Sequence, residues 1–135
     1  MENKILIEKA LAARERAYAP YSKFRVGAAL LTREGKVYTG CNIENAAYGP
    51  TNCAERTAFF KAVSEGEREF AAIAVAGGKQ DQTGKEYCFP CGVCRQVMAE
   101  FCEGSFRILA AKSPEDYREY TLNELLPERF GSNNL

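Results

Sequence analysis

Three cysteines and one glutamate stand at spacings that could bind a metal ion and use it. Cys53 is followed two residues later by Glu55, and Cys91 and Cys94 form a Cys-x-x-Cys motif. Cysteine thiolates are common zinc ligands, and a zinc site with three protein ligands leaves a fourth position for water. A carboxylate beside that position could serve as a general base. These residues are therefore candidates for an open zinc site with Glu55 as the base.

The composition excludes several other chemistries. The chain has no histidine, which excludes Ser-His-Asp and Cys-His nucleophile systems and imidazole metal ligands. Its 18 acidic residues balance its 18 basic residues. Domains that bind nucleic acid or anionic membranes usually carry an excess of Lys and Arg. We therefore expect a small-molecule substrate, with neither nucleic acid nor a membrane as a partner.

The cysteine content and the N-terminal segment together indicate a cellular location. Residues 1–9 carry charges among their apolar positions and show no cleavage-site pattern, so we expect neither a signal peptide nor a membrane anchor. Six cysteines without a secretory segment are typical of a reducing compartment, where Cys-x-x-Cys motifs more often bind metals or react in redox chemistry than form disulfides. We therefore expect a cytoplasmic protein.

Helical and strand-like patterns alternate along the chain. Apolar residues recur at helical spacing near the N-terminus, and two strand-like runs then flank a glycine, which is typical of a hairpin. Short continuous apolar runs indicate buried strands, and polar segments with glycine indicate loops. The predicted elements are helices over 3–18, 53–65, 91–102 and 122–126, strands over 24–32, 36–42, 70–76 and 106–111, and a loop over 77–87.

The order of these elements predicts the fold class. A chain of 135 residues is long enough for one core, so we expect a single domain over residues 1–135. Alternating strands and helices favour right-handed crossovers and an α/β fold with a partly parallel sheet of about five strands. Cys53 and Cys91 then lie at helix N-termini, where backbone N–H groups and the helix dipole favour thiolates.

Two arginines adjoin the candidate ligands. Arg56 follows Glu55 directly, and Arg95 follows Cys94 directly. Three thiolates on Zn²⁺ carry a net negative charge, which guanidinium groups would offset by donating hydrogen bonds to the sulfurs. We expect Arg56 and Arg95 in this supporting role, and the alternative is that they are solvated helix residues.

Other sites could use overlapping sets of cysteines. Cys88 lies three residues before Cys91, and as a fourth ligand it would close the zinc site and leave a structural Cys₄ module without activity. A redox Cys-x-x-Cys pair would need neither the third cysteine nor the glutamate. Cys41 and Cys102 are more typical of small buried hydrophobic residues than of ligands.

Four sequence blocks, in order, resemble those of the small, homotetrameric cytidine deaminases. They are 18–24 (YAPYSKF), 40–48 (GCNIENAAY), 52–58 (NCAERTA) and 90–96 (PCGVCRQ), and the resemblance covers nearly the whole chain. It implies a three-layer α/β/α domain with helices on both faces of the sheet and one Zn²⁺ per chain. It also implies hydrolysis of cytidine, and of 2′-deoxycytidine, to uridine or deoxyuridine and ammonia in pyrimidine salvage.

The resemblance assigns roles to individual residues. It implies that a water activated by zinc attacks C4 of cytosine while Glu55 moves protons, that Asn42 and Glu44 hydrogen-bond the ribose, and that Phe24 and the Ala54 backbone contact the base. Alternation along an extended chain would point Asn42 and Glu44 to the same side. A carboxylate near the sugar would repel phosphate, which favours a free nucleoside. A different cytosine-containing nucleoside is the alternative substrate.

Three further residues resemble family positions that reach the site of a neighbouring subunit. They are Ala46, Tyr48 and Phe130, and they imply a homotetramer with shared sites. Ordinary packing is the alternative for Tyr48 and Phe130. The sequence departs from the family at Phe89, where Ser or Thr commonly precedes Pro-Cys, and in segment 79–88, which is longer than usual.

Overall fold

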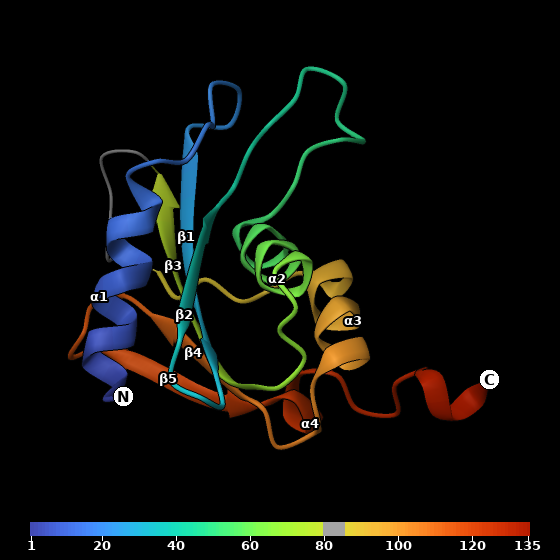
Figure 1. Cartoon of the computed structure of the whole chain (residues 1–135). Coiled ribbons are helices and arrows are strands. Elements are labelled where there is room, and N and C mark those ends of the chain that lie inside the picture. The colour runs from blue at the N-terminus through green and yellow to red at the C-terminus, as the bar shows by residue number, and fades with distance from the viewer. Residues whose placement is uncertain (80–85) are drawn as a thin grey trace.

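A mixed sheet of five strands lies at the centre of the computed structural model, which describes residues 1–79 and 86–135 (Figure 1). The spatial order of the strands is β2-β1-β3-β4-β5. β1 is antiparallel to β2 and β3, β3 is parallel to β4, and β4 is antiparallel to β5. The strands are β1 (Phe24–Thr32), β2 (Val37–Cys41), β3 (Phe70–Lys79), β4 (Arg107–Ala111) and β5 (Tyr117–Thr121).

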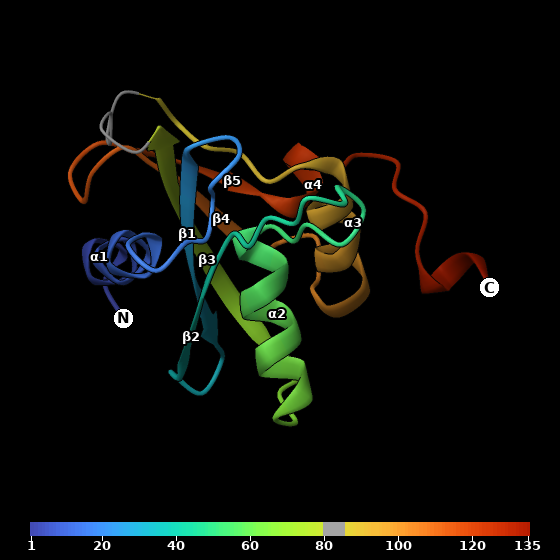
Figure 2. The same ribbon diagram turned by 90° about the horizontal axis from the view of Figure 1, so that it is seen from above.

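Helices cover both faces of this sheet. Figure 2 shows α1 on one face and α2 with α3 on the other. The helices are α1 (Asn3–Arg14), α2 (Ala54–Ser64), α3 (Gly92–Phe101), the short α4 (Leu122–Leu125) and a 3₁₀ turn over Ser132–Asn134. The three-layer α/β/α arrangement and the parallel portion of the sheet confirm the predicted fold class. Within residues 1–79 and 86–135, no helix is long and apolar enough to cross a membrane.

Alternation along the central strands produces two separate cores. Leu30 of β1 and Ile73 of β3 pack in the cluster beneath α2 and α3. Leu31 and Ala74 point to the opposite face and pack against α1. Successive side chains of a strand alternate between faces, so a strand covered by helices on both sides must be apolar at nearly every position. This is why β1 reads as an almost continuous apolar run and is buried over its last six residues.

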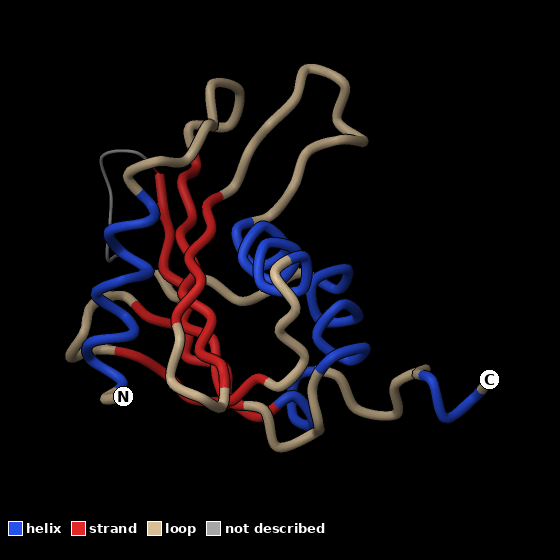
Figure 3. The backbone as a smooth tube through the Cα atoms, in the orientation of Figure 1, coloured by secondary structure: helices blue, strands red, loops and turns tan. Residues whose placement is uncertain are grey.

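The first helix ends earlier than its apolar pattern predicted. α1 stops at Arg14 rather than at residue 18, because the chain around Tyr18 pairs with the segment after β2. The Tyr18 amide donates to the Asn42 carbonyl at 3.0 Å, and the Glu44 amide donates to the Tyr18 carbonyl at 2.8 Å. The two connecting segments around 15–23 and 42–53 are loops beyond the strands (Figure 3).

The third strand is longer than predicted. β3 continues to Lys79, where it pairs with Phe24 of β1, so the first three residues of the loop predicted over 77–87 are strand. The remainder of that loop includes residues 80–85, which lie outside the described residues. Most of segment 79–88, which was expected to be longer than usual, therefore also lies outside the described residues.

The fifth strand was counted in the expected sheet but had no assigned place in the sequence. β5 is an edge strand with no fully buried residue, so it lacks the apolar run that marked the central strands. Its β-forming residues Tyr117, Tyr120 and Thr121 were the available signal. Thr121 also begins α4, where it forms a capping box with Glu124.

Candidate metal centre and its cavity

Three cysteine side chains converge where α2 and α3 begin. Cys53 and Cys91 are the N-cap residues of the two helices, and Cys94 lies in the first turn of α3. Their sulfur atoms all lie within 4.8 Å of one another, although 38 positions separate Cys53 from Cys91. The two predicted helix N-termini therefore meet at one place, which a shared metal site needs.

The spacing of the sulfurs fits a tetrahedral zinc ion. Two thiolates bound at about 2.3 Å in tetrahedral geometry are about 3.8 Å apart. The Cys53 and Cys91 sulfurs are separated by 3.8 Å, far more than the roughly 2.05 Å of a disulfide bond. Three soft sulfur donors favour zinc over magnesium or calcium. Since a three-ligand set leaves one coordination position open, the residues present fit a catalytic zinc ion.

Close packing of α2 on β2 positions the first of these cysteines. A Cβ atom on Gly40 would stand 2.5 Å from the Ala54 carbonyl oxygen and 2.6 Å from the Ala58 amide nitrogen. Only a glycine in β2 lets the first turn of α2 approach this closely. At the same turn the Thr57 hydroxyl donates to the Cys53 carbonyl at 3.2 Å. The sheet therefore fixes the backbone that carries Cys53.

A guanidinium group acts directly on the sulfur of Cys53. Arg56 Nη2 donates to Cys53 Sγ at 3.3 Å, which is the supporting role that the sequence indicated for this arginine. Hydrogen bonds from the Cys94 thiol and from Arg56 lower the pKa of Cys53 to about 5. The same contact with Cys53, together with burial, raises the pKa of Cys94. Metal binding requires deprotonated thiolates, so a low pKa at Cys53 favours a bound cation.

Arg95 is held differently. Its Nε donates to the Pro90 carbonyl at 2.7 Å and its Nη1 to the Leu125 carbonyl at 2.7 Å. Among the hydrogen bonds of the described residues, none joins Arg95 to a sulfur. This arginine ties the loop before Cys91 to the end of α4, so it supports the ligand through the backbone.

Glu55 is buried in the first turn of α2, beside the cysteines. Its side chain is 4% exposed, and it lines the same cavity as Cys53 and Cys91. Burial raises the pKa of this carboxyl group to about 7, with the nearby Cys53 thiolate contributing in the same direction. A carboxyl group that titrates near neutral pH can both accept and return a proton under physiological conditions. Glu55 therefore has the position and the acidity of a proton carrier.

Cys88 does not join the metal-ligand candidates. Within the described residues, the group of potential ligands that could hold an ion contains only Cys53, Cys91 and Cys94. The Cys88 side chain packs in the core beneath α2 and α3, and burial raises the pKa of its thiol to about 11. A neutral thiol facing apolar side chains is a poor ligand. The geometry thus disfavours a closed Cys₄ site.

The residues assigned to the nucleoside gather around one cavity of about 350 Å³. Phe24, Asn42, Glu44 and Ala54 all line it, together with Glu55 and two of the candidate metal ligands, Cys53 and Cys91. Phe24 begins β1, Asn42 and Glu44 follow β2, and Ala54 opens α2. Asn42 and Glu44 face the same space, as expected from alternation along an extended chain. Four separate sequence blocks thus form one site.

The polar side chains of Asn42 and Glu44 are anchored before any ligand binds. Asn42 accepts from the Val26 amide and donates to the Phe24 carbonyl, both at 2.8 Å. The Glu44 carboxylate accepts from the Tyr21 and Ser22 amides at 3.0 and 3.1 Å and from the Ser22 hydroxyl. These bonds hold both groups in fixed orientations, and each retains hydrogen-bonding capacity for a ligand.

Ala46, Tyr48 and Phe130 do not reach this cavity within the chain. The Tyr48 side chain is 83% exposed and that of Phe130 60% exposed, and Ala46 is exposed on the same loop as Tyr48. None of the three lines the cavity beside the cysteines. The isolated chain therefore leaves two large aromatic rings in solvent.

Sequence reasoning assigned no binding role to one part of the cavity wall. Tyr87, Cys88, Phe89 and Val75 line the cavity. Cys88 was considered only as a ligand, and Phe89 only as a departure from the family. Their closeness to Cys91 in the sequence was the signal that could have indicated them.

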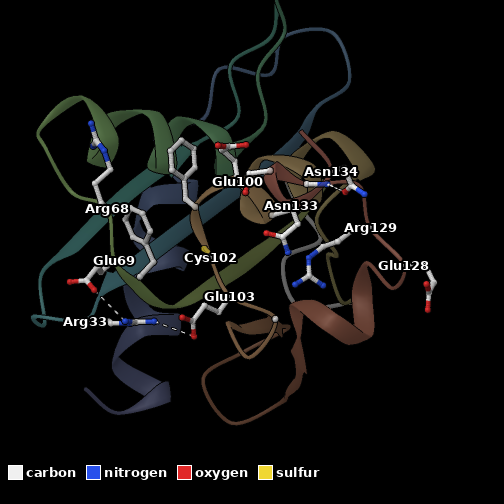
Figure 4. A pocket seen from close by; sticks show the side chains of 16 residues that line it. Arg33, Arg68, Glu69, Glu100, Cys102, Glu103, Glu128, Arg129, Asn133 and Asn134 are labelled. Atoms are coloured by element: carbon white, nitrogen blue, oxygen red, sulfur yellow. Dashed lines mark hydrogen bonds and ion pairs between the residues drawn. The ribbon is translucent and has the colours of Figure 1, made fainter.

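A larger cavity of about 720 Å³ lies at the opposite end of α3 (Figure 4). The C-terminal segment forms part of its wall, and Arg33 lies there between Glu69 and Glu103 at 3.3 and 3.6 Å. None of the candidate metal ligands lines it. The chemistry of the residues, and not the volume, therefore identifies the smaller cavity as the functional site.

Known proteins resemble this chain along its length. A family model described as "Cytidine and deoxycytidylate deaminase zinc-binding region" matches residues 1–109. Cytidine deaminases of Sporosarcina psychrophila and Halalkalibacterium halodurans are 52% and 50% identical over the whole chain and over 96% and 98% of their own lengths. A crystal structure of cytidine deaminase from Burkholderia pseudomallei, 51% identical, has a TM-score of 0.88 and covers 96% of this chain and 100% of that one.

Proposed function

This chain belongs to the cytidine and deoxycytidylate deaminase family, and we propose that it hydrolyses cytidine to uridine and ammonia with the help of a zinc ion. The observation that carries the proposal is the convergence of three sulfurs within 4.8 Å of one another, next to a buried glutamate that is not among them. A ligand set of three thiolates is open, whereas a structural zinc site would be closed by a fourth ligand.

The residues that hold the ion are Cys53, Cys91 and Cys94. When bound, zinc supplies a water of lowered pKa that is nucleophilic at neutral pH. Arg56 offsets the charge of the thiolates by donating to Cys53 Sγ. The positive ends of α2 and α3 act in the same sense, because both helices begin at these cysteines.

Glu55 carries protons during the reaction. It takes a proton from the attacking water, delivers it to N3 of the cytosine ring, and then assists the amino group at C4 as it leaves as ammonia. Its pKa of about 7 suits both directions of transfer. The overall change consumes one water, breaks the bond between C4 and its amino nitrogen, and forms the C4 carbonyl of uridine.

The remaining residues of the cavity orient the nucleoside. Asn42 and Glu44 hydrogen-bond the ribose with the capacity that their backbone contacts leave free. Phe24 packs beside the base, and the Ala54 backbone contacts the pyrimidine edge. Since these groups are fixed in advance, binding loses little free energy to ordering them. We extend the proposal to 2′-deoxycytidine and to a cytoplasmic role in pyrimidine salvage.

Metal content and substrate conversion test the proposed function together. Purified protein should contain one zinc per chain and should convert cytidine to uridine, which is followed by the change in ultraviolet absorbance. Removal of zinc by a chelator should abolish the conversion, and added zinc should restore it. Protein that holds one zinc per chain but leaves cytidine unchanged would contradict the proposal.

We also propose a homotetramer in which neighbouring chains complete each site. A deaminase must exclude water around a small polar ligand, and the cavity of one chain is open. Tyr48 and Phe130 are exposed aromatic residues without a place in their own cavity. The C-terminal segment that carries Phe130 also extends away from the body of the fold (Figure 1), which leaves it free to reach another chain.

Complementation between two inactive variants tests the shared sites. A Glu55→Gln chain and a Phe130→Ala chain, each impaired alone, should regain some activity after mixing and subunit exchange. The reason is that a fraction of mixed sites combines an intact Glu55 with an intact Phe130 from the neighbour. Sedimentation should show a tetramer. A fully active monomer, or no recovery after proven exchange, would contradict shared sites.

A further inference from the structure

Residues 87–89 form one wall of the proposed active-site cavity. Tyr87, Cys88 and Phe89 all line it, and Cys91 follows two residues after Phe89. Consecutive Cα atoms are about 3.8 Å apart, so this wall stands close to Cys91, one of the candidate metal ligands. It therefore borders the end of the cavity where C4 of a bound cytosine must lie.

The middle residue of the wall is locked against the sheet. The Cys88 side chain is only 9% exposed and packs against β3. A Cβ atom on Gly77 would stand 2.9 Å from Cys88 Sγ, so the glycine of β3 makes room for the sulfur. With Cys88 fixed inward, the chain at this point cannot move away from the cavity without exposing core.

Tyr87 is held from three sides by residues around β5. Its hydroxyl donates to Asp116 Oδ1 at 2.6 Å. The Arg118 guanidinium carbon lies 4.4 Å from the centre of the ring, and Lys112 Nζ lies 4.5 Å from it. Both distances are within the range of cation–π attraction. The ring is therefore fixed in position at the cavity wall.

Phe89 is held by the same strand. Its ring packs edge-to-face on Tyr120, with ring centres 5.8 Å apart and an interplanar angle of 70°. Arg118 and Tyr120 are alternate residues of β5 and so project from the same face of the sheet. One face of this edge strand thus supports both Tyr87 and Phe89. The Phe89 side chain lines the cavity and remains 42% exposed.

Resting on the proposed function, we propose that Phe89 is a specificity-determining residue that limits the size of the group on the exocyclic nitrogen of cytosine, and that Tyr120 positions it. The nitrogen on C4 lies at the metal end of the cavity, where the Phe89 ring forms part of the wall. Binding pockets discriminate one added methylene or methyl group by roughly 10- to 200-fold. The contact with Tyr120 opposes a movement of the Phe89 ring that would admit a larger group.

Binding of two nucleosides to a variant that does not turn them over measures this effect. In zinc-loaded Glu55→Gln protein, the Kd of cytidine and of N4-methylcytidine is determined by calorimetry. The unaltered wall should bind N4-methylcytidine more weakly by about tenfold or more. Adding Phe89→Ala should lower the ratio of the N4-methylcytidine Kd to the cytidine Kd by about tenfold. The Kd of cytidine itself should change only a few-fold. Phe89→Leu, which keeps an apolar side chain of intermediate size beside Tyr120, should give an intermediate ratio and serves if the alanine variant does not fold.

Two variants of the supporting residue separate positioning from general stability. Tyr120→Ala removes the ring on which Phe89 rests and should shift the ratio in the same direction as Phe89→Ala. Tyr120→Phe keeps that ring and should retain the original ratio. Phe60→Ala, at a similarly exposed aromatic residue of α2 that does not line the cavity, is the matched control and should leave the ratio unchanged.

The outcomes distinguish this inference from the proposed function. An unchanged ratio in zinc-loaded Phe89→Ala and Phe89→Leu proteins would overturn the role of Phe89. Equal shifts in Tyr120→Ala and Tyr120→Phe would overturn the positioning role. Failure of wild-type, zinc-loaded protein to convert cytidine would instead contradict the proposed function. The ratio of Kd values does not depend on that result, because it is measured without turnover.

Discussion

Replacement of Glu55 by glutamine should leave zinc content and fold intact while lowering kcat for cytidine by about 10⁴-fold. The amide has nearly the same shape as the carboxyl group but can neither accept nor return the proton. General acid–base catalysis commonly contributes about 10²- to 10⁴-fold, and a group that serves several proton transfers should lie at the upper end. Glu55 is 4% exposed, and the glutamine side chain has nearly the same volume, so the packing around it should be preserved.

Steady-state kinetics with metal analysis measures this effect. Glu100→Gln changes an exposed glutamate of α3 that does not line the cavity and is the matched control, with activity expected near that of the wild type. Because Glu55 is not a zinc ligand in this proposal, metal content should equal that of the control. Retention of more than about a tenth of the wild-type kcat would exclude Glu55 as the proton carrier.

Single alanine substitutions at Cys53, Cys91 or Cys94 should each lower zinc affinity by at least about 100-fold. Even residues that only support metal ligands contribute about 10- to 100-fold, so loss of a ligand from a three-ligand set should cost more. Two remaining sulfurs cannot complete the tetrahedral site, so cytidine turnover should disappear with the metal. Competition with a chromophoric chelator measures the affinity, and calorimetric or thermal unfolding reports the associated loss of stability.

The other cysteines supply the controls for this experiment. Cys88→Ala, Cys41→Ala and Cys102→Ala should retain one zinc per chain, because none of these sulfurs belongs to the converging group. Cys88 is the most informative control because it lines the cavity and precedes Cys91 by three residues. Release of zinc from Cys88→Ala as readily as from Cys91→Ala would mean a closed Cys₄ site and would contradict the proposed catalytic role.

The exposed aromatic residues connect the single chain to its proposed assembly. Phe130 is joined to the body through Gln96, whose side-chain amide donates to the Phe130 carbonyl at 2.9 Å, while its ring stays in solvent. The same segment borders the 720 Å³ cavity of Figure 4.

The sequence by itself indicated the candidate metal ligands and the elements that carry them. Cys53, Cys91 and Cys94 are recognisable because residue type and spacing along the chain are local properties, and so is the proximity of Glu55 to Cys53. The strand over 24–32 was predicted with its observed bounds, since a strand buried on both faces must be apolar at nearly every position. The two helix starts at the cysteines were also predicted, since the residues that mark a helix start are local in the sequence.

Only the tertiary structure decided features that depend on contacts between distant segments. α1 ends at Arg14 because Tyr18 pairs with the chain near Asn42, and no local pattern reports that pairing. Arg95 reaches backbone carbonyls of its surroundings rather than a sulfur, a choice that depends on where α4 lies. Helical periodicity and local propensity cannot weigh such long-range hydrogen bonds.

The cavity wall shows most clearly which features the sequence alone indicates and which depend on the tertiary structure. Tyr87 and Phe89 were visible in the sequence beside Cys91, but nothing local indicated that β5 would support them. An edge strand with exposed residues carries a weak sequence signal, because a strand with one face in water needs no continuous apolar run. Its contacts with Tyr87 and Phe89 arise only once the sheet has formed. The chemistry of the site was thus set by local residue types, and the shape of its cavity by packing across the fold.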